Sequence, residues 1–257
     1  MQEILDRAAV GLDLVSICDH DTLGAYRSEW TLPENLRLLP GIEMTCQVGE
    51  LDLHMLAYFP AGLSEEIHDW AKELESDRRQ RVLKGVEQLR EMGIPLLWRD
   101  LEAEVGDSVP CRSHVARALV RGRLCSTTAQ AFRQWLGRIK FQRPALTAIQ
   151  GFSEVHSLGG LTYWAHPRAA HIEEHGAYLL AAGLDGVEVL YKNLKSPNRR
   201  TAREFQEQHR LGICGGSDLH QENSKFVLGR FGVDLSRLDP RLVNPVGEIA
   251  YSTSASK

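Results

Sequence analysis

The stretch GLTYWAHP, residues 160–167, decides the fold class, because it is an apolar strand that ends at a proline and begins a regular alternation of helices and strands. The alternation continues with a helix that ends near 178–182, a strand at 186–190, a helix at 200–209 and a strand at 212–215. Alternation of this kind predicts an α/β fold with a mostly parallel sheet or a barrel.

Outside this stretch, the pattern divides the chain into a barrel and an insert. A helix at 2–9 comes first, followed by strands at 14–18, 38–44 and 51–59. Apolar residues at a helical period then predict a long helix at 64–93, with shorter helices at 114–121 and 129–136. We therefore expect a barrel built from residues 1–63 and 147–250, an all-helical insert at 64–146, and a frayed polar tail at 251–257.

Composition excludes several classes of function. The chain has 257 residues, 30 basic and 34 acidic side chains, a net charge of −4 and 43% hydrophobic residues. These values argue against disorder and against binding of nucleic acid or a membrane surface by bulk charge. The five cysteines form no CxxC pair, and we expect reduced thiols in a cytoplasmic protein. No apolar run approaches the roughly 18–20 residues that span a bilayer, so no membrane partner is expected.

Histidine, aspartate and glutamate residues, which are common metal ligands, follow the predicted strands or lie near their ends. These residues are Asp19, His20 and Asp21 after LVSIC, Glu43 in GIEM, His54 inside LDLHMLAYF, His166 in WAHP, and Asp218 and His220 after GICGGS. The carboxyl ends of parallel strands surround the site in α/β folds, so these side chains should converge. Imidazole and carboxylate ligands together suit zinc, manganese or iron(II). The pattern therefore indicates a multinuclear centre, with Glu43 suited to bridge two ions.

The alternative for each residue taken alone is a structural role. A single histidine in a strand is more often a packed or hydrogen-bonded residue than a ligand, and one Asp-X-His motif is a weak signal. Five strands that all carry such residues favour the metal interpretation.

Taken together, these motifs resemble the PHP (polymerase and histidinol phosphatase) metal-dependent phosphoesterases. The resemblance covers roughly residues 1–230 and includes ICDHDTLGAY, then GIEMT, with Glu43 eleven residues before His54, then WAHP and GGSDLH. The insert VPCRSHVARALVRGRLCSTTAQAFRQWLG, residues 109–137, is similar to that of the subgroup containing 3′,5′-nucleoside bisphosphate phosphatases and 5′–3′ exoribonucleases.

The resemblance implies a distorted (β/α)7 barrel with up to three divalent ions, Mn, Zn or Fe, at its C-terminal mouth. It implies six metal ligands: His20, Glu43, His54, His166, Asp218 and His220. Asp19 would orient His20 through the other ring nitrogen.

The sequence departs from the family at its beginning. Family members open with a strand that ends in His-X-His, whereas this sequence begins in the helix that follows that strand, so three expected ligands and the first barrel strand are absent. By the family's allocation, the ion held by Glu43, His54 and His166 keeps its protein ligands, while the other two ions keep two protein ligands each. Either the natural start lies upstream, or this is a truncated paralogue with a reduced site. A homodimer contact could cover the open strand edges.

Substrate contacts are expected from the insert and from one loop. Arg112, Ser113 and His114 lie at a predicted helix start, where guanidinium and backbone N–H groups suit a phosphate; Lys192 follows a barrel strand. The subgroup has Arg-Pro-His here, with proline in place of Ser113. The alternative is that Ser113 is a helix N-cap and Arg112 a solvated charge.

Three functions remain open. The first is hydrolysis of a nucleotide phosphomonoester, such as a 3′,5′-bisphosphonucleotide, by metal-activated water, with His114 or a metal-bound water protonating the leaving group. The second is 5′–3′ exoribonuclease action on a short RNA end, and the third is a non-catalytic module that binds metal or nucleotide. Hydrolysis of amides is a weaker alternative.

Overall fold

The structure, a computed structural model, describes residues 1–106, 108–191, 196–219 and 228–243. It divides into two compact units, one made of residues 1–68 and 146–257 and the other of residues 69–145. Within the described ranges, no helix is both long and apolar enough to cross a bilayer.

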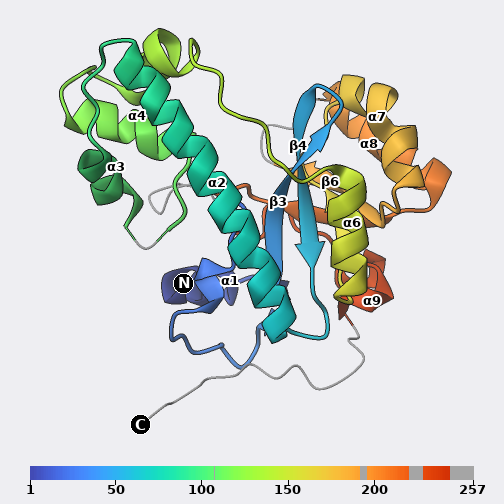
Figure 1. Cartoon of the computed structure of the whole chain (residues 1–257). Coiled ribbons are helices and arrows are strands. Elements are labelled where there is room, and N and C mark those ends of the chain that lie inside the picture. Colours follow the sequence, from blue (N-terminus) through green and yellow to red (C-terminus); the bar gives the residue numbers. More distant parts are fainter. Residues whose placement is uncertain (107, 192–195, 220–227, 244–257) are drawn as a thin grey trace. The chain divides into compact units, whose positions relative to one another are not determined.

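The first unit is an α/β structure with a five-stranded sheet (Figure 1). Its strands are β1 (Leu14–Val15), β2 (Arg37–Leu38), β3 (Gly41–Val48), β4 (Leu51–Tyr58), β5 (Leu161–Trp164), β6 (Gly186–Tyr191) and β7 (Gly212–Gly216). Its helices are α1 (Gln2–Ala8), η1 (Gly24–Tyr26), α6 (Ala148–Ser157), α7 (Ala169–Ala181), α8 (Ser196–His209), η3 (Leu235–Arg237) and α9 (Pro240–Val243). The α/β class predicted from the sequence is confirmed.

The sheet has the order β3-β4-β5-β6-β7, and it is less parallel than the sequence pattern predicts. Strands β5, β6 and β7 are parallel, but β4 runs antiparallel to both β3 and β5. The cause is local, because β3 and β4 are joined by a two-residue turn in which Gly49 has φ 55°, a conformation suited to glycine at the first position of a type II′ turn. Two residues can connect only antiparallel strands.

Strand β3 also differs from the predicted strand at 38–44. The extended segment is interrupted at Pro40, and β3 then continues to Val48, so Glu43 is the third of its eight residues and does not lie near its end. The register pairs Glu43 with Leu56 and pairs Leu56 with Tyr163. Glu43 is therefore level with the third of the four residues of β5, and the β3–β4 hairpin extends beyond the end of β5.

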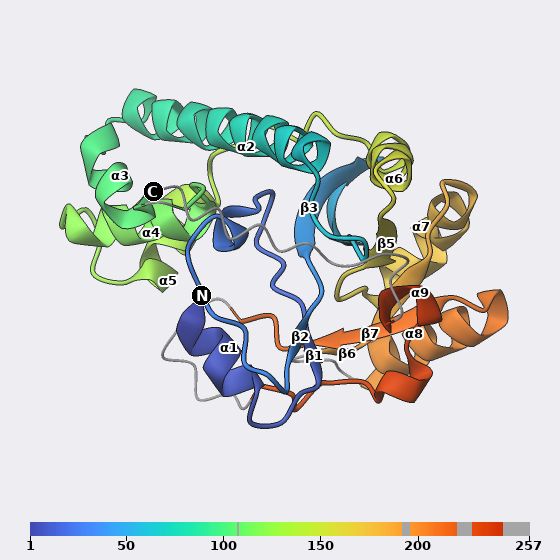
Figure 2. The same ribbon diagram turned by 90° about the horizontal axis from the view of Figure 1, so that it is seen from below.

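The two faces of the sheet have different roles. Met44 and Cys46 face α6, where Gly151 leaves no room for a side chain, since a Cβ there would lie 3.3 Å from both sulfur atoms. Helices α7 and α8 lie side by side, and α8 packs along β6 (Figure 2). The opposite, inner face carries Tyr163, whose ring occupies the space left by Gly186.

Strands β1 and β2 form a separate, two-stranded parallel sheet. An isolated parallel bridge joins His20, which follows β1, to Glu43 on β3.

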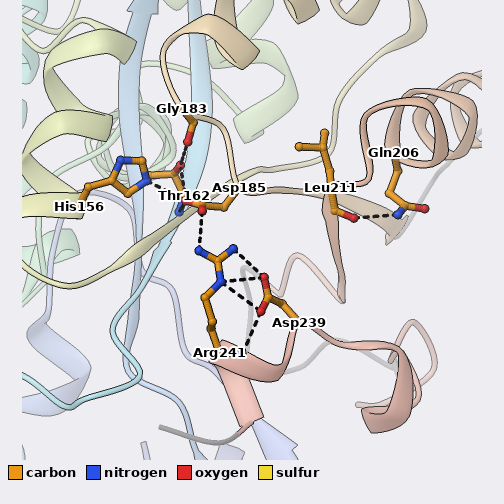
Figure 3. A network of polar contacts seen from close by, with 8 residues as sticks. All are labelled: His156, Thr162, Gly183, Asp185, Gln206, Leu211, Asp239 and Arg241. Carbon is orange, nitrogen blue, oxygen red and sulfur yellow. Dashed lines mark hydrogen bonds and ion pairs between the residues drawn. The ribbon is translucent and has the colours of Figure 1, made fainter. Parts of the chain in front are cut away.

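A polar network lies at the N-terminal ends of β5 and β6 (Figure 3). Asp185, just before β6, accepts hydrogen bonds from the backbone N–H of Thr162 at 2.9 Å and contacts His156 Nε2 at 2.7 Å. Arg241 of the C-terminal α9 donates to Asp185 at 3.0 Å and also pairs with Asp239. The network therefore ties α6, β5, β6 and α9 together.

The second unit is helical. It contains most of α2 (Glu65–Glu91), together with α3 (Trp98–Val105), α4 (Arg112–Arg121), α5 (Thr128–Ala131) and the π-helix η2 (Phe132–Leu136). Its core includes Val86, Leu89, Leu101, Val115 and Leu119. Gly85 lets the Phe141 ring pack on α2, because a Cβ at this glycine would lie 2.5 Å from the ring.

Candidate metal centre

Four of the predicted ligands converge on the inner face of the sheet. Glu43 lies on β3 and His54 on β4, and both side chains point to the same face, because the register pairs Thr45 with His54 two residues beyond Glu43. His166 follows the end of β5, and His20 lies on the extended segment after β1.

The donor atoms of these residues are close together around the Glu43 carboxylate. Its Oε1 lies 2.9 Å from Nδ1 of His54 and 3.1 Å from Nε2 of His166, and its Oε2 lies 3.5 Å from Nδ1 of His20. One ligand atom each from His20, Glu43 and His54 can be chosen so that all lie within 4.8 Å of one another. An ion with bonds of about 2.0–2.2 Å needs donors about 3–4 Å apart, so this set of nitrogen and oxygen donors fits a divalent cation.

Hydrogen bonds and opposite charges stabilise the Glu43 carboxylate within this cluster. Glu43 is 7% exposed, and although burial would raise its pKa, hydrogen bonds from His166 and His54 and the charge of His20 hold that pKa well below its usual range. The pKa of His166 is raised, because the hydrogen bond and charge of Glu43 outweigh the effect of burial. Glu43 is thus a buried anion that attracts positive charge.

Backbone pairing explains how His20 reaches this cluster. The Glu43 N–H donates to the carbonyl of Asp19 at 3.0 Å, and the Asp21 N–H donates to the carbonyl of Glu43 at 3.0 Å, with His20 between them. The buried Asp21 carboxylate accepts from the backbone N–H of Thr45 at 2.6 Å and from its hydroxyl at 2.9 Å. Asp21 therefore anchors the segment to β3, while the exposed Asp19 lines the adjoining pocket. Its predicted contact with the ring of His20 stays a prediction.

One acidic residue of the site is missing from the sequence interpretation. Glu188 on β6 is 5% exposed, and its Oε2 accepts the backbone N–H of His166 at 2.7 Å. Burial is the main reason that its pKa is raised to about 7. The signal in the sequence is a single glutamate inside the apolar strand GVEVLY.

A pocket of about 280 Å³ opens beside the cluster. Asp218 lines it just past β7, with an exposed side chain that raises the pKa of His166 and Glu188 through its charge. The lining of the pocket also includes apolar side chains from the β1 segment, β4 and β7, among them Leu14, Ile17, Leu56, Tyr58 and Cys214. Among the described residues no strand joins β1 to β7, so the barrel is open between them.

Comparison with known proteins supports the same family as the motifs. No family model matches the chain. The chain is 28% identical over 241 residues to the 5′–3′ exoribonuclease Rnm of Escherichia coli, covering 84% of this chain and 78% of the relative. A solved structure from Bifidobacterium adolescentis, assigned as a metal-dependent phosphoesterase, superimposes with a TM-score of 0.75 at 26% identity over 91% of this chain and 87% of that chain. Together with the motifs, these two similarities support a PHP-family phosphoesterase.

A second solved structure, an amidohydrolase from Chromobacterium violaceum, shares the fold of this chain. Its TM-score is 0.72 at 21% identity, over 93% of this chain and 87% of that chain.

The other residues that the PHP resemblance assigns to the site are placed only in part. His220 and Lys192 lie outside the described residues. Glu43, His166 and Asp218 line one pocket, and the role of Asp218 and of the four clustered residues as ligands stays a prediction.

The predicted phosphate-binding residues Arg112, Ser113 and His114 belong to the helical unit, and their approach to the metal centre stays a prediction. The helix N-cap is Cys111, so the alternative that Ser113 is the N-cap is wrong: Ser113 is the second residue of α4. His114 is the third residue of α4, and its side chain accepts the Cys111 N–H at 3.1 Å, as the N3 side chain of a capping box does. The exposed Arg112 stacks over Phe132 and Phe141, with its guanidinium carbon 5.7 and 5.1 Å from the ring centres.

Proposed function

We propose that this PHP protein is a metal-dependent phosphoesterase that hydrolyses a phosphomonoester of a nucleotide of the 3′,5′-bisphosphonucleotide kind. The observation that supports it is the convergence of His20, His54 and His166 on the buried Glu43 carboxylate. The coarser activity, hydrolysis of a phosphoric ester, is what the names of two similar proteins describe. The insert supports this choice of substrate, because its exposed Arg112 could offer a guanidinium to a phosphate.

In this mechanism Glu43, His54 and His166 would hold one divalent ion, with His20 and Asp218 available for further ions. A bound ion of this kind supplies hydroxide near neutral pH and neutralises charge on the phosphate oxygens. Glu43 keeps its negative charge among the histidines, so it would offer an anionic ligand to a divalent cation. His114 is the candidate for protonating the leaving oxygen.

A second candidate is 5′–3′ exoribonuclease action on a short RNA end. The name of the Escherichia coli relative favours it. Phe132 is 37% exposed with Arg112 stacked over its ring, an arrangement that suits stacking of a base.

The test compares phosphate release from a 3′,5′-bisphosphonucleotide with nucleotide release from a short 5′-phosphorylated RNA, each in the presence of Mn²⁺. We expect Glu43→Gln and His54→Ala to lose activity on either substrate. His156→Asn is the matched control, because it breaks the contact with Asp185 at the opposite ends of the strands. Hydrolysis that survives both EDTA and the Glu43→Gln change would show that the proposal is wrong, and metal binding without turnover would indicate a non-catalytic module.

A further inference from the structure

We propose that Glu188 is a positioning residue for the metal centre, holding His166 in the orientation that directs its Nε2 to Glu43 and His54. The inference rests on the proposed function and adds a residue to its site. Glu188 reaches His166 through the backbone, since its Oε2 accepts the His166 N–H at 2.7 Å. The same histidine places its Nε2 3.1 Å from Glu43 Oε1 and 3.2 Å from His54 Nδ1.

The backbone of His166 needs such support. Its φ is 34°, a left-handed value that is unfavourable for a residue with a Cβ, and it precedes Pro167, a position where extended backbone is preferred. A strained residue of this kind costs about 1–3 kcal/mol and persists only where its surroundings fix it.

Strand β6 holds this turn at two points. Glu188 accepts the N–H of His166, and three residues later the Tyr191 hydroxyl donates to the carbonyl of Pro167 at 3.0 Å. Both anchors come from one strand that is paired on both sides, with β5 and with β7. The position of His166 is therefore set by the sheet, and the loop itself contributes less.

The space around Glu188 is shaped for a carboxylate. The side chain is 5% exposed and its Oε1 lies against Gly216, where an added Cβ would be only 2.6 Å from this oxygen. Burying a carboxylate costs free energy, and an apolar side chain of similar volume would serve the fold alone at least as well. A role for the carboxylate in orienting His166 accounts for its presence beside the cluster.

Two substitutions separate this role from a general effect on stability. Glu188→Met keeps the volume and removes the acceptor, whereas Glu188→Gln keeps an acceptor oxygen for the His166 N–H. Thr162→Val is the matched control, because it removes a fully buried polar group from β5 at the Asp185 end of the strand. The measurements are the Kd for Mn²⁺ by titration calorimetry and the exchange rate of the His166 amide proton in metal-free protein.

Loss of a residue that orients a ligand typically weakens metal binding by about 10–100-fold, and we expect this for Glu188→Met. Glu188→Gln should recover most of the affinity, and Thr162→Val should bind as the wild type does. In metal-free protein, the His166 amide should exchange faster in Glu188→Met than in the other two variants.

An unchanged Kd and unchanged exchange in Glu188→Met would overturn the inference. So would a Glu188→Gln variant as weak as Glu188→Met, because the charge and not the hydrogen bond would then matter. If the wild type itself binds no Mn²⁺, the proposed function is wrong, and so is the role of Glu188 at a metal centre. Amide exchange would then show separately whether Glu188 holds the His166 turn.

Discussion

Replacing Glu43 by glutamine should abolish the stabilisation of this protein by Mn²⁺. The carboxylate contacts all three histidines of the cluster, at distances from 2.9 to 3.5 Å, so it is the anion around which an ion would bind. A ligand at 100 times its Kd stabilises a folded protein by about 2.7 kcal/mol. In a protein of this size, about 1 kcal/mol corresponds to about 2–4 °C, so the wild type should melt about 5–11 °C higher with Mn²⁺.

The same substitution has a smaller cost without metal. A hydrogen bond to a charged group is worth about 1.5–3 kcal/mol, and glutamine keeps one of the two oxygen acceptors, so about one such bond is lost. The pKa of Glu43 is depressed in the folded state, so its contribution is present above the usual carboxyl pKa and disappears as the pH falls through the depressed value. The difference between variant and wild type should therefore persist at pH 7 and close only in strong acid.

Differential scanning calorimetry with and without Mn²⁺ measures both effects. His156→Asn is the control, because it should lose some stability and still respond to the metal as the wild type does. A Glu43→Gln protein whose melting temperature rises with Mn²⁺ as much as that of the wild type would refute the reasoning.

Three further outcomes are expected. Burial would raise the pKa of the Cys111 thiol, but its contacts with His114 and Ser113 outweigh burial and lower this pKa to about 6. Alkylation by iodoacetamide should therefore be half-maximal near that pH, and a midpoint near pH 9 would contradict this. Gly212→Ala should destabilise the fold by about 1–3 kcal/mol, since its Cβ would lie 2.2 Å from the Tyr163 hydroxyl oxygen. In urea unfolding, adding Tyr163→Phe should recover part of this loss, and equal losses with and without the hydroxyl would refute the cause. Gly216→Ala should weaken Mn²⁺ binding as Glu188→Met does, because its Cβ would displace the Glu188 carboxylate, and an unchanged Kd in calorimetry would argue against this contact.

The ligands of the candidate centre could be predicted from the sequence because their chemistry is local. His166 follows an apolar strand directly, and an imidazole or carboxylate beside such a strand is visible without knowledge of the fold. The direction of β4 was not predicted, because it depends on the two-residue turn at Gly49 more than on the composition of the strand. His54 lies beside the end of β5, because the antiparallel register pairs Met55 with Trp164.

The residues that support the ligands could not be predicted in the same way. Glu188 is one glutamate in an apolar strand, and its meaning depends on the β5–β6 register, which pairs Tyr163 with Gly186 and so brings Glu188 level with the residue before His166. The role of Gly216 depends likewise on its contact with Glu188 across two paired strands. Such roles arise from pairing over long sequence separations, and a single sequence does not specify them.

Backbone strain links the fold to the proposed chemistry. Asp21, His166 and Asp218 all have positive φ, at 53°, 34° and 48°, and Asp21 and His166 are each held by a buried carboxylate hydrogen bond. Asp21 uses its own side chain to bind Thr45, whereas His166 depends on Glu188 and so leaves its imidazole free for the cluster. A ligand cannot both brace its own turn and donate to an ion with the same side chain. Because Glu188 on β6 holds the His166 turn, the imidazole of His166 is available to the cluster. This division of roles accounts for a buried carboxylate on the strand next to the one that His166 follows.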